Sequence, residues 1–90
     1  MYIVELTERA VEDLLLLEKN EPKSFGKAEK LLKELVKHPT TGTGKPERLK
    51  FKEYSIWSRR ISKKHRMVYE IRDKNISVLV VSAYGHYDGK

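Results

Sequence analysis

The fold of this chain is decided by residues 56–83, which read IWSRRISKKHRMVYEIRDKNISVLVVSA. Side-chain character alternates with a period of two over residues 56–62 and again over residues 65–72, a pattern typical of half-buried β-strands. Residues 76–83 are almost continuously apolar, which predicts a central strand buried on both faces. Short polar stretches separate the three segments, so we expect them to form an antiparallel meander.

The residues before this meander predict one further strand and two helices. Residues 2–6 are rich in β-branched and aromatic side chains, which indicates a short strand. Thr7 is a suitable N-cap for a helix that continues to Asn20, because apolar residues recur there at helical spacing. A second amphipathic helix begins at residues 22–24 and ends at His38, since the proline that follows disfavours helical geometry in the residue before it.

A glycine-containing loop at residues 40–46 and a strand at residues 48–51 connect the helices to the meander. This order predicts an α+β fold of two layers, with two N-terminal helices packed on one face of a mainly antiparallel sheet of four to five strands. The chain has 90 residues, so we expect a single domain that spans residues 1–90. The loop sequence TTGTGKP lacks the Gly-Lys-Ser/Thr ending of a P-loop.

The positive charge of the chain is concentrated in its second half. Nineteen Lys and Arg residues against thirteen Asp and Glu residues give a formal net charge of +6. Residues 1–45 are neutral overall, with eight basic and eight acidic side chains, whereas residues 46–90 carry eleven basic and five acidic ones. This asymmetry indicates an anionic partner, with nucleic acid as the first choice. A basic surface that serves only solubility is the alternative when charge is considered alone.

The composition argues against several other classes of protein. The chain contains no cysteine, so neither a disulfide framework nor a thiolate metal site can form. Its three histidines lack the spacing of metal ligands, and we therefore expect no metal and no cofactor. No stretch approaches the ~20 apolar residues of a membrane span, and the N-terminus does not read as a signal peptide. A cytoplasmic protein with no membrane partner is the expectation.

The period-two alternation also predicts which side chains the helices leave uncovered. If Met67 and Tyr69 face the helices, then Arg60 and Arg66 face the other way. These two arginines would be close cross-strand neighbours, because they flank a short turn between antiparallel strands. Two adjacent positive charges repel each other, and proteins tolerate this repulsion where the site binds an anion or where a carboxylate lies nearby. Two solvated surface arginines, one of them paired with Glu70, are the equally weighted alternative.

Four short motifs stand at characteristic positions along the chain. They are GKPERLK at residues 44–50, WSRRI at 57–61, HRMVY at 65–69 and GHY at 85–87. Together they resemble the YoeB-type toxins of the RelE/ParE superfamily, from type II toxin–antitoxin systems, over essentially the whole chain. The resemblance implies a RelE-like, microbial-ribonuclease-like fold. It also implies a ribosome-dependent, metal-independent mRNA endonuclease whose partners are the ribosome, mRNA and a cognate YefM-like antitoxin that neutralises it.

The resemblance further implies roles for individual residues. Glu47 matches the general base, Arg66 the arginine that stabilises the phosphate, and His86 the general acid. Tyr87 matches the terminal tyrosine of the family and completes the catalytic set. The implied RNA-binding residues are all basic: Lys45, Lys50, Arg59 and Arg60.

Two other functions remain compatible with the residues. A ParE-like toxin has the same architecture but inhibits DNA gyrase and is not a nuclease, and that branch is not expected to combine Glu47, Arg66 and His86. A noncatalytic nucleic-acid-binding module would use the same basic sheet face without needing an acid or a base. Homodimerisation is compatible with the sequence, which does not decide it.

Overall fold

The computed structural model describes residues 1–50 and 54–85, which form two helices and five strands. The helices are α1 (Glu8–Asn20) and α2 (Pro22–Leu35), and the strands are β1 (Ile3–Leu6), β2 (Glu47–Arg48), β3 (Ile56–Arg60), β4 (Arg66–Arg72) and β5 (Ser77–Ser82). A 3-10 turn at Asp73–Asn75 joins β4 to β5.

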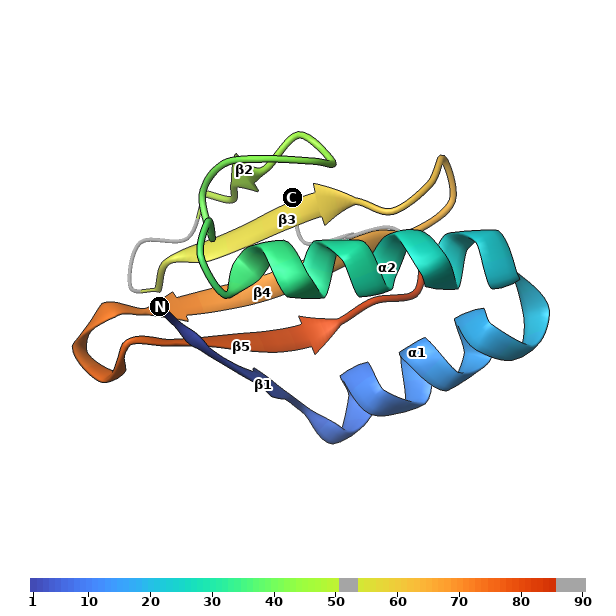
Figure 1. The fold of residues 1–90 in the computed structure, drawn as a ribbon, viewed down its shortest axis with the longest axis horizontal. Coiled ribbons are helices and arrows are strands. Elements are labelled where there is room, and N and C mark those ends of the chain that lie inside the picture. Colours follow the sequence, from blue (N-terminus) through green and yellow to red (C-terminus); the bar gives the residue numbers. More distant parts are fainter. Residues whose placement is uncertain (51–53, 86–90) are drawn as a thin grey trace.

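The five strands form one mixed sheet in the order β1-β5-β4-β3-β2 (Figure 1). The pairs β2–β3, β3–β4 and β4–β5 are antiparallel, whereas β1 lies parallel to β5 at one edge. The antiparallel part is the predicted meander, because tight connections force successive strands to reverse direction. This confirms the α+β class and the mainly antiparallel sheet. Strand β5 lies inside the sheet, between β1 and β4, as expected of a central strand.

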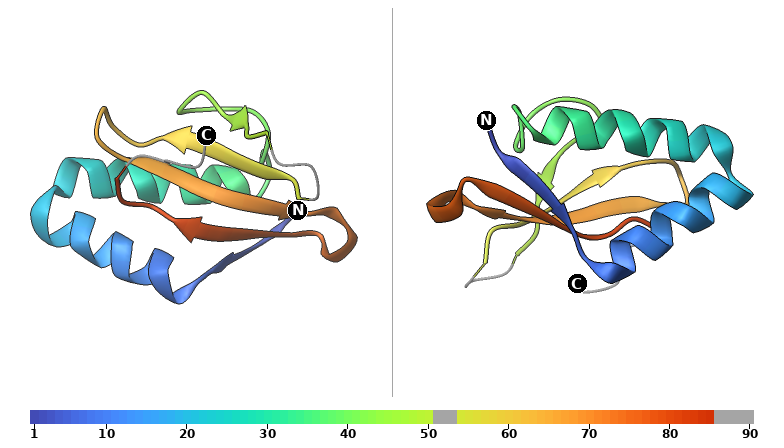
Figure 2. Two further views of the ribbon diagram at one scale, coloured as in Figure 1. Left: turned by 180° about the vertical axis from the view of Figure 1, so that it is seen from behind. Right: turned by 60° about the horizontal axis from the view of Figure 1, so that its bottom comes forward.

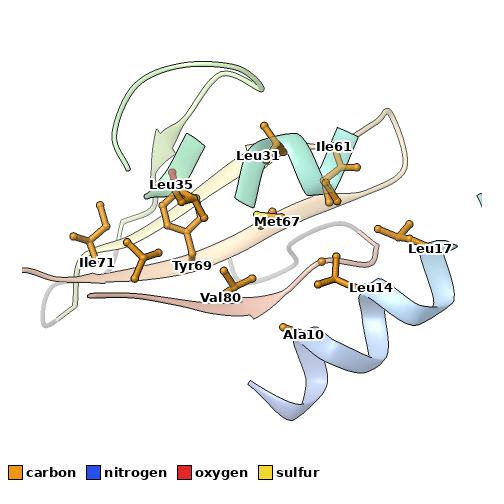
Figure 3. Close-up of a cluster of buried hydrophobic side chains, with 13 residues drawn as sticks. Ala10, Leu14, Leu17, Leu31, Leu35, Ile61, Met67, Tyr69, Ile71 and Val80 are labelled. Atoms are coloured by element: carbon orange, nitrogen blue, oxygen red, sulfur yellow. The ribbon is translucent and has the colours of Figure 1, made fainter. Parts of the chain in front are cut away.

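Both helices lie on the same face of the sheet, and no helix covers the opposite face of the described sheet (Figure 2). The core fills the space between the two layers (Figure 3). Met67 and Tyr69 are fully buried in this core, as the alternation predicts. The other core side chains shown come from both helices, from β4 and β5, and from the position directly after β3: Ala10, Leu14, Leu17, Leu31, Leu35, Ile61, Ile71 and Val80.

Thr7 confirms its predicted part as the N-cap of α1. Its hydroxyl oxygen accepts the N–H of Ala10 at 3.0 Å, which satisfies a donor that has no partner within the helix. The same hydroxyl donates to the carbonyl oxygen of Val81 at 2.8 Å. One side chain thus connects the start of α1 to the end of β5.

The end of α2 and both ends of β2 differ from the boundaries expected. Helix α2 ends at Leu35, not at His38, and the N–H of His38 closes a turn onto the carbonyl oxygen of Glu34 at 2.7 Å. The strand expected at residues 48–51 begins and ends earlier, as Glu47–Arg48, and Phe51 lies outside the described residues.

The last strand is less enclosed than its apolar sequence suggests. Ile76 has a φ of 50° and is exposed, so it belongs to the turn, and β5 begins at Ser77. Leu79, Val81 and Ser82 are only half-buried. The expectation of burial on both faces was therefore wrong for this strand, because the helices cover only one of them.

Candidate active site

The register of the sheet gathers three of the predicted site residues on the face that lacks helices in the described structure. Glu47 in β2 lies opposite Ser58 in β3, and Ser58 lies opposite Val68 in β4. Arg60 lies opposite Arg66, which confirms that the two arginines are cross-strand neighbours. Directly opposed residues, and residues two apart along a strand, point to the same face of a sheet. Glu47, Arg60 and Arg66 therefore share the uncovered face.

The separation between Glu47 and Arg66 leaves room for a substrate group. The two residues are two strands apart and two residues apart along the strands. A strand spacing of about 4.8 Å and a rise of about 3.4 Å per residue place their Cα atoms roughly 12 Å apart. Both side chains are long, so their charged ends can approach a phosphodiester from two sides.

Arg66 is half-buried, and one of its guanidinium nitrogens, Nη1, donates to the hydroxyl of Ser58 at 3.3 Å. Within residues 1–50 and 54–85, neither Arg60 nor Arg66 forms an ion pair. The carboxylate of Glu70 instead pairs with Arg72 at 3.2 Å, so the alternative in which Glu70 neutralises one of the two site arginines is wrong. Two adjacent guanidinium groups thus share the uncovered face, and neither forms an ion pair with a carboxylate of the described residues.

The loop before β2 brings Lys45 to the same end of the sheet. Gly44 has a φ of 85°, and its carbonyl oxygen accepts the N–H of Arg60 at 2.7 Å. A Cβ atom at Gly44 would lie 2.8 Å from the carbonyl oxygen of Arg60, so this close approach requires glycine. Lys45 follows directly and is exposed, as is Lys50 beyond β2.

Arg59 does not belong to this face, although it was expected to bind RNA. Its side chain is completely buried, and its Nη1 lies 2.9 Å from Oε1 of Glu34. Its Nη2 donates to the carbonyl oxygens of His38 and Thr41, and its Nε donates to the hydroxyl of Tyr69 at 3.1 Å. Protein groups occupy every nitrogen of the guanidinium, so it is not available to an RNA phosphate. We therefore exclude Arg59 from the RNA-binding set.

The buried arginine instead builds the loop that precedes β2. The carboxylate of Glu34 accepts both the N–H and the hydroxyl of Thr43, at 2.8 and 2.6 Å. The hydroxyl of Thr43, then its backbone N–H and the charge of Arg59, hold the pKa of Glu34 below its usual range despite partial burial. Burial raises the pKa of Tyr69, whose neutral hydroxyl donates to the carbonyl oxygen of Pro39 at 2.7 Å. We call Glu34, Thr43, Arg59 and Tyr69 the loop anchor.

The segment after β5 passes next to Arg66. The carbonyl oxygen of Gly85 accepts the backbone N–H of Arg66 at 2.9 Å, so the chain leaves Gly85 from a point beside the predicted phosphate-binding residue. His86 and Tyr87 lie outside the described residues, and their placement in the site stays a prediction.

Two searches bear on metals and membranes. Over residues 1–50 and 54–85, no group of three or more His, Asp or Glu side chains is arranged to hold a metal ion. Neither helix in this part of the chain has the length and apolar character that crossing a membrane requires.

A model of a protein family, the YoeB-like toxin of bacterial type II toxin-antitoxin system, matches residues 6–87. The chain belongs to this family. Toxin YoeB of Synechocystis sp. is 37% identical over 84 residues, which are 93% of this chain and 95% of that protein. The family assignment agrees with the four motifs and with the superfamily they indicated.

Solved structures of YoeB proteins share the fold. The YoeB dimer from Staphylococcus aureus has a TM-score of 0.81 and 33% identity, covering 96% of this chain and 98% of that one. The heterotetrameric YoeB–YefM toxin–antitoxin complex from the same organism gives a TM-score of 0.78 and 32% identity, covering 97% and 99%. An archaeal RelE–RelB complex from Pyrococcus horikoshii, 12% identical with a TM-score of 0.78, shows the fold alone. The expected RelE-like fold is confirmed.

Proposed function

We propose that this toxin is a ribosome-dependent, metal-independent mRNA endonuclease that acts in the bacterial cytoplasm. One observation carries the proposal: the sheet register gathers a carboxylate, Glu47, and two guanidinium groups, Arg60 and Arg66, on the face that no helix covers. A base and a concentration of positive charge on one accessible face are what cleavage of a polyanion requires. Membership of the YoeB-like toxins supports the same reaction.

The proposed reaction uses the nucleophile that RNA itself carries, the 2′-hydroxyl. Glu47 takes the proton of this hydroxyl as O2′ attacks the adjacent phosphorus. The P–O5′ bond then breaks, and His86 donates a proton to the departing O5′. The products are a 2′,3′-cyclic phosphate and a 5′-hydroxyl. A positioned acid or base contributes roughly 10²–10⁴-fold to such a step.

The basic residues have separate tasks in this proposal. Arg66, whose guanidinium is oriented by the buried hydroxyl of Ser58, stabilises the charge that develops on the phosphate oxygens. Arg60 and the exposed Lys45 and Lys50 contact the flanking phosphates and hold the strand in register. Tyr87 contacts the RNA next to His86, by stacking on a base or by a hydrogen bond to a phosphate.

We also propose that a YefM-like antitoxin neutralises this chain, because the YoeB of Staphylococcus aureus forms a complex with YefM. An acidic segment that folds on binding would match the net charge of +6 and cover the basic sheet face. A homodimer is proposed for the free toxin, as for the Staphylococcus aureus relative. Analytical ultracentrifugation of the toxin alone and with its antitoxin tests both assemblies.

The deciding experiment is primer extension on mRNA from cells that express the wild-type toxin or His86→Ala. We expect cleavage in phase with codons for the wild type and none for the variant. If neither protein cleaves mRNA, and Arg66→Ala weakens RNA binding while His86→Ala does not, the protein is a noncatalytic nucleic-acid-binding module. If His86→Ala cleaves like the wild type, His86 is not the general acid. If the wild type produces no codon-phased cleavage, the ribosome-dependent nuclease is refuted, and inhibition of DNA gyrase should be measured next.

A further inference from the structure

Buried side chains hold the backbone of residues 83–85, the segment that leads out of the sheet toward position 86. The N–H of Ala83 donates to Oδ2 of Asp13 at 2.9 Å, and the N–H of Gly85 donates to Nδ1 of His65 at 2.8 Å. The carbonyl oxygen of Gly85 accepts the N–H of Arg66 at 2.9 Å. Asp13 and His65 are both buried, at 8% and 3% exposure. Gly85 is therefore hydrogen-bonded through both its N–H and its carbonyl oxygen.

The two ring nitrogens of His65 face different partners, and this defines the tautomer. Because Nδ1 accepts the N–H of Gly85, it carries no proton. Nε2 lies 2.5 Å from Oε2 of Glu21 and therefore carries the ring proton, which it donates to the carboxylate. The neutral Nε2–H form satisfies both contacts at once. That hydrogen bond is also the largest cause that lowers the pKa of Glu21.

The chain Glu21–His65–Gly85 connects three separate parts of the fold. Glu21 sits at the junction of α1 and α2, His65 comes immediately before β4, and Gly85 follows β5. Neighbouring groups also hold His65 in place. The centroid of its imidazole lies 4.3 Å from that of the Tyr84 ring, and the backbone N–H of His65 donates to the hydroxyl of Ser62 at 3.1 Å. A carboxylate that fixes the tautomer and direction of an imidazole is a common device for aiming its other nitrogen.

We propose that His65 is a positioning residue of the nuclease: its Nδ1 fixes the peptide of Gly85 and so sets the direction in which the chain enters His86. This inference rests on the proposed function, in which His86 is the general acid. His65 is too deeply buried to touch RNA, and it acts only through the backbone. Gly85 has a φ of 80°, a conformation that other residues rarely adopt, so the direction of the chain at this point is specific. A misplacement of about 1 Å can reduce an enzymatic rate roughly 10²-fold.

Two substitutions of His65 separate the tasks of its nitrogens. In His65→Asn, the amide oxygen takes the place of Nδ1 and can accept the N–H of Gly85, but the side chain is too short to reach Glu21. In His65→Gln, the amide nitrogen can still donate to Glu21, but the acceptor at the Nδ1 position is lost. Ile71→Val serves as the control, because it weakens the core at the far end of β4 without touching Gly85.

The test measures mRNA cleavage on purified ribosomes together with hydrogen exchange of the Gly85 amide. For His65→Gln we expect the rate at saturating ribosomes to fall about 10- to 100-fold. The ribosome concentration for half-maximal rate should stay constant, and the Gly85 amide should exchange faster. His65→Asn should keep most of the rate and the amide protection, and Ile71→Val should keep both. If His65→Gln does not fold, Glu21→Ala replaces it, since it removes the acceptor that fixes the tautomer; a smaller loss of rate is expected.

The outcomes distinguish a failure of the positioning role of His65 from a failure of the proposed nuclease function. If the wild type cleaves and His65→Gln, or Glu21→Ala in its place, cleaves equally fast, the positioning inference is overturned and the proposed function stands. Equal losses in His65→Asn and His65→Gln, with the Gly85 amide protected in both, also overturn it, because only the bulk of the ring would then matter. If the wild type does not cleave, the proposed function fails and the positioning of its acid fails with it.

Discussion

Arg59 and Arg60 are adjacent in the sequence but belong to two regions with opposite treatment of positive charge. Arg59 is completely buried in the loop anchor, where Glu34, Tyr69 and carbonyl oxygens occupy all its nitrogens. Arg60 is exposed on the uncovered sheet face, opposite Arg66 and with no ion pair among the described residues. The alternation of a single strand therefore divides one basic motif into a structural residue and a candidate RNA-binding residue.

The difference shows what each region is built for. A guanidinium removed from water needs a full set of acceptors, and the loop anchor provides them while it shapes residues 38–44. Two adjacent guanidinium groups, one exposed and one half-buried, repel each other and destabilise the free protein slightly, and an anionic ligand would offset this repulsion. The contacts of the first region stabilise the fold, whereas the charge of the second region remains available to a binding partner. Substitutions in the two regions should accordingly affect different measurements.

The largest effect on folding is expected from Arg59→Ala. This substitution leaves the carboxylate of Glu34, the hydroxyl of Tyr69 and several loop carbonyls without their donor, and breaking a buried ion pair from one side costs about 3–5 kcal/mol. Chemical denaturation should show a loss of unfolding free energy of this size. Arg60→Ala, one residue along and exposed, is the matched control and should cause no loss of stability, because it removes a like-charge neighbour of Arg66 that costs about 0.2–1 kcal/mol. Equal losses in the two variants would contradict the division between the regions.

Among the basic residues of the two regions, the largest effect on activity is expected from Arg66→Ala. Removing one preorganised group that stabilises the transition-state charge typically lowers the rate about 10²–10³-fold. Ribosome-bound mRNA cleavage should fall by this factor while thermal stability changes little. Arg72→Ala is the control, because Arg72 lies at the other end of the same strand and is exposed. A similar loss of cleavage in Arg72→Ala would mean that general positive charge, not the position of Arg66, drives the reaction.

Much of this arrangement is predictable from the sequence, because the period of two in residues 56–72 assigns side chains to faces. It places Met67 and Tyr69 in the core and Arg60 next to Arg66, and the structure confirms both. The same alternation puts Arg59 on the side of the helices, so its burial could have been read from the pattern. The prediction that Arg59 binds RNA came from the resemblance to the toxin motifs, which does not consider which way a side chain points. It therefore assigned Arg59 to the wrong face of the sheet.

Other features were not predictable because their partners are distant in the sequence. Glu34 and Arg59 are 25 residues apart, and Asp13 reaches Ala83 across 70 residues. Local propensity contains no information on such pairs. The alternation over residues 65–72 places His65 on the same face as Met67 and Tyr69, but it does not reveal its carboxylate and glycine partners. These long-range polar contacts are what joins the elements to the loop and to the segment before position 86.

Protonation of Glu34 at low pH should weaken the loop anchor and lower the free energy of unfolding. The hydroxyl and N–H of Thr43 and the charge of Arg59 hold the pKa of Glu34 below its unfolded value of 4.5. The stabilisation is therefore fully present above about pH 4.5 and is lost as the pH falls through the lower pKa of the folded state. Urea denaturation between about pH 3 and 6, a range that brackets the ordinary titration of Glu side chains, should show stability rising with pH. In Glu34→Gln this slope should be shallower, whereas Glu29→Gln, exposed on the same helix, should retain it; an unchanged slope in Glu34→Gln would exclude Glu34 as a source.

The smallest effect on stability is expected from a substitution of Arg60. Replacing Arg60 by Gln removes the like-charge contact with Arg66, so the free protein should become more stable by about 0.2–1 kcal/mol at low salt. The gain should fade toward 1 M salt, where the Debye length shrinks to about 3 Å. The same variant should need a higher ribosome concentration for half-maximal cleavage, because one phosphate contact is lost. A gain in stability together with weaker substrate binding would show that the charge on this face serves a partner and not the fold. A loss of stability in Arg60→Gln would instead place Arg60 with Arg59 as a structural residue.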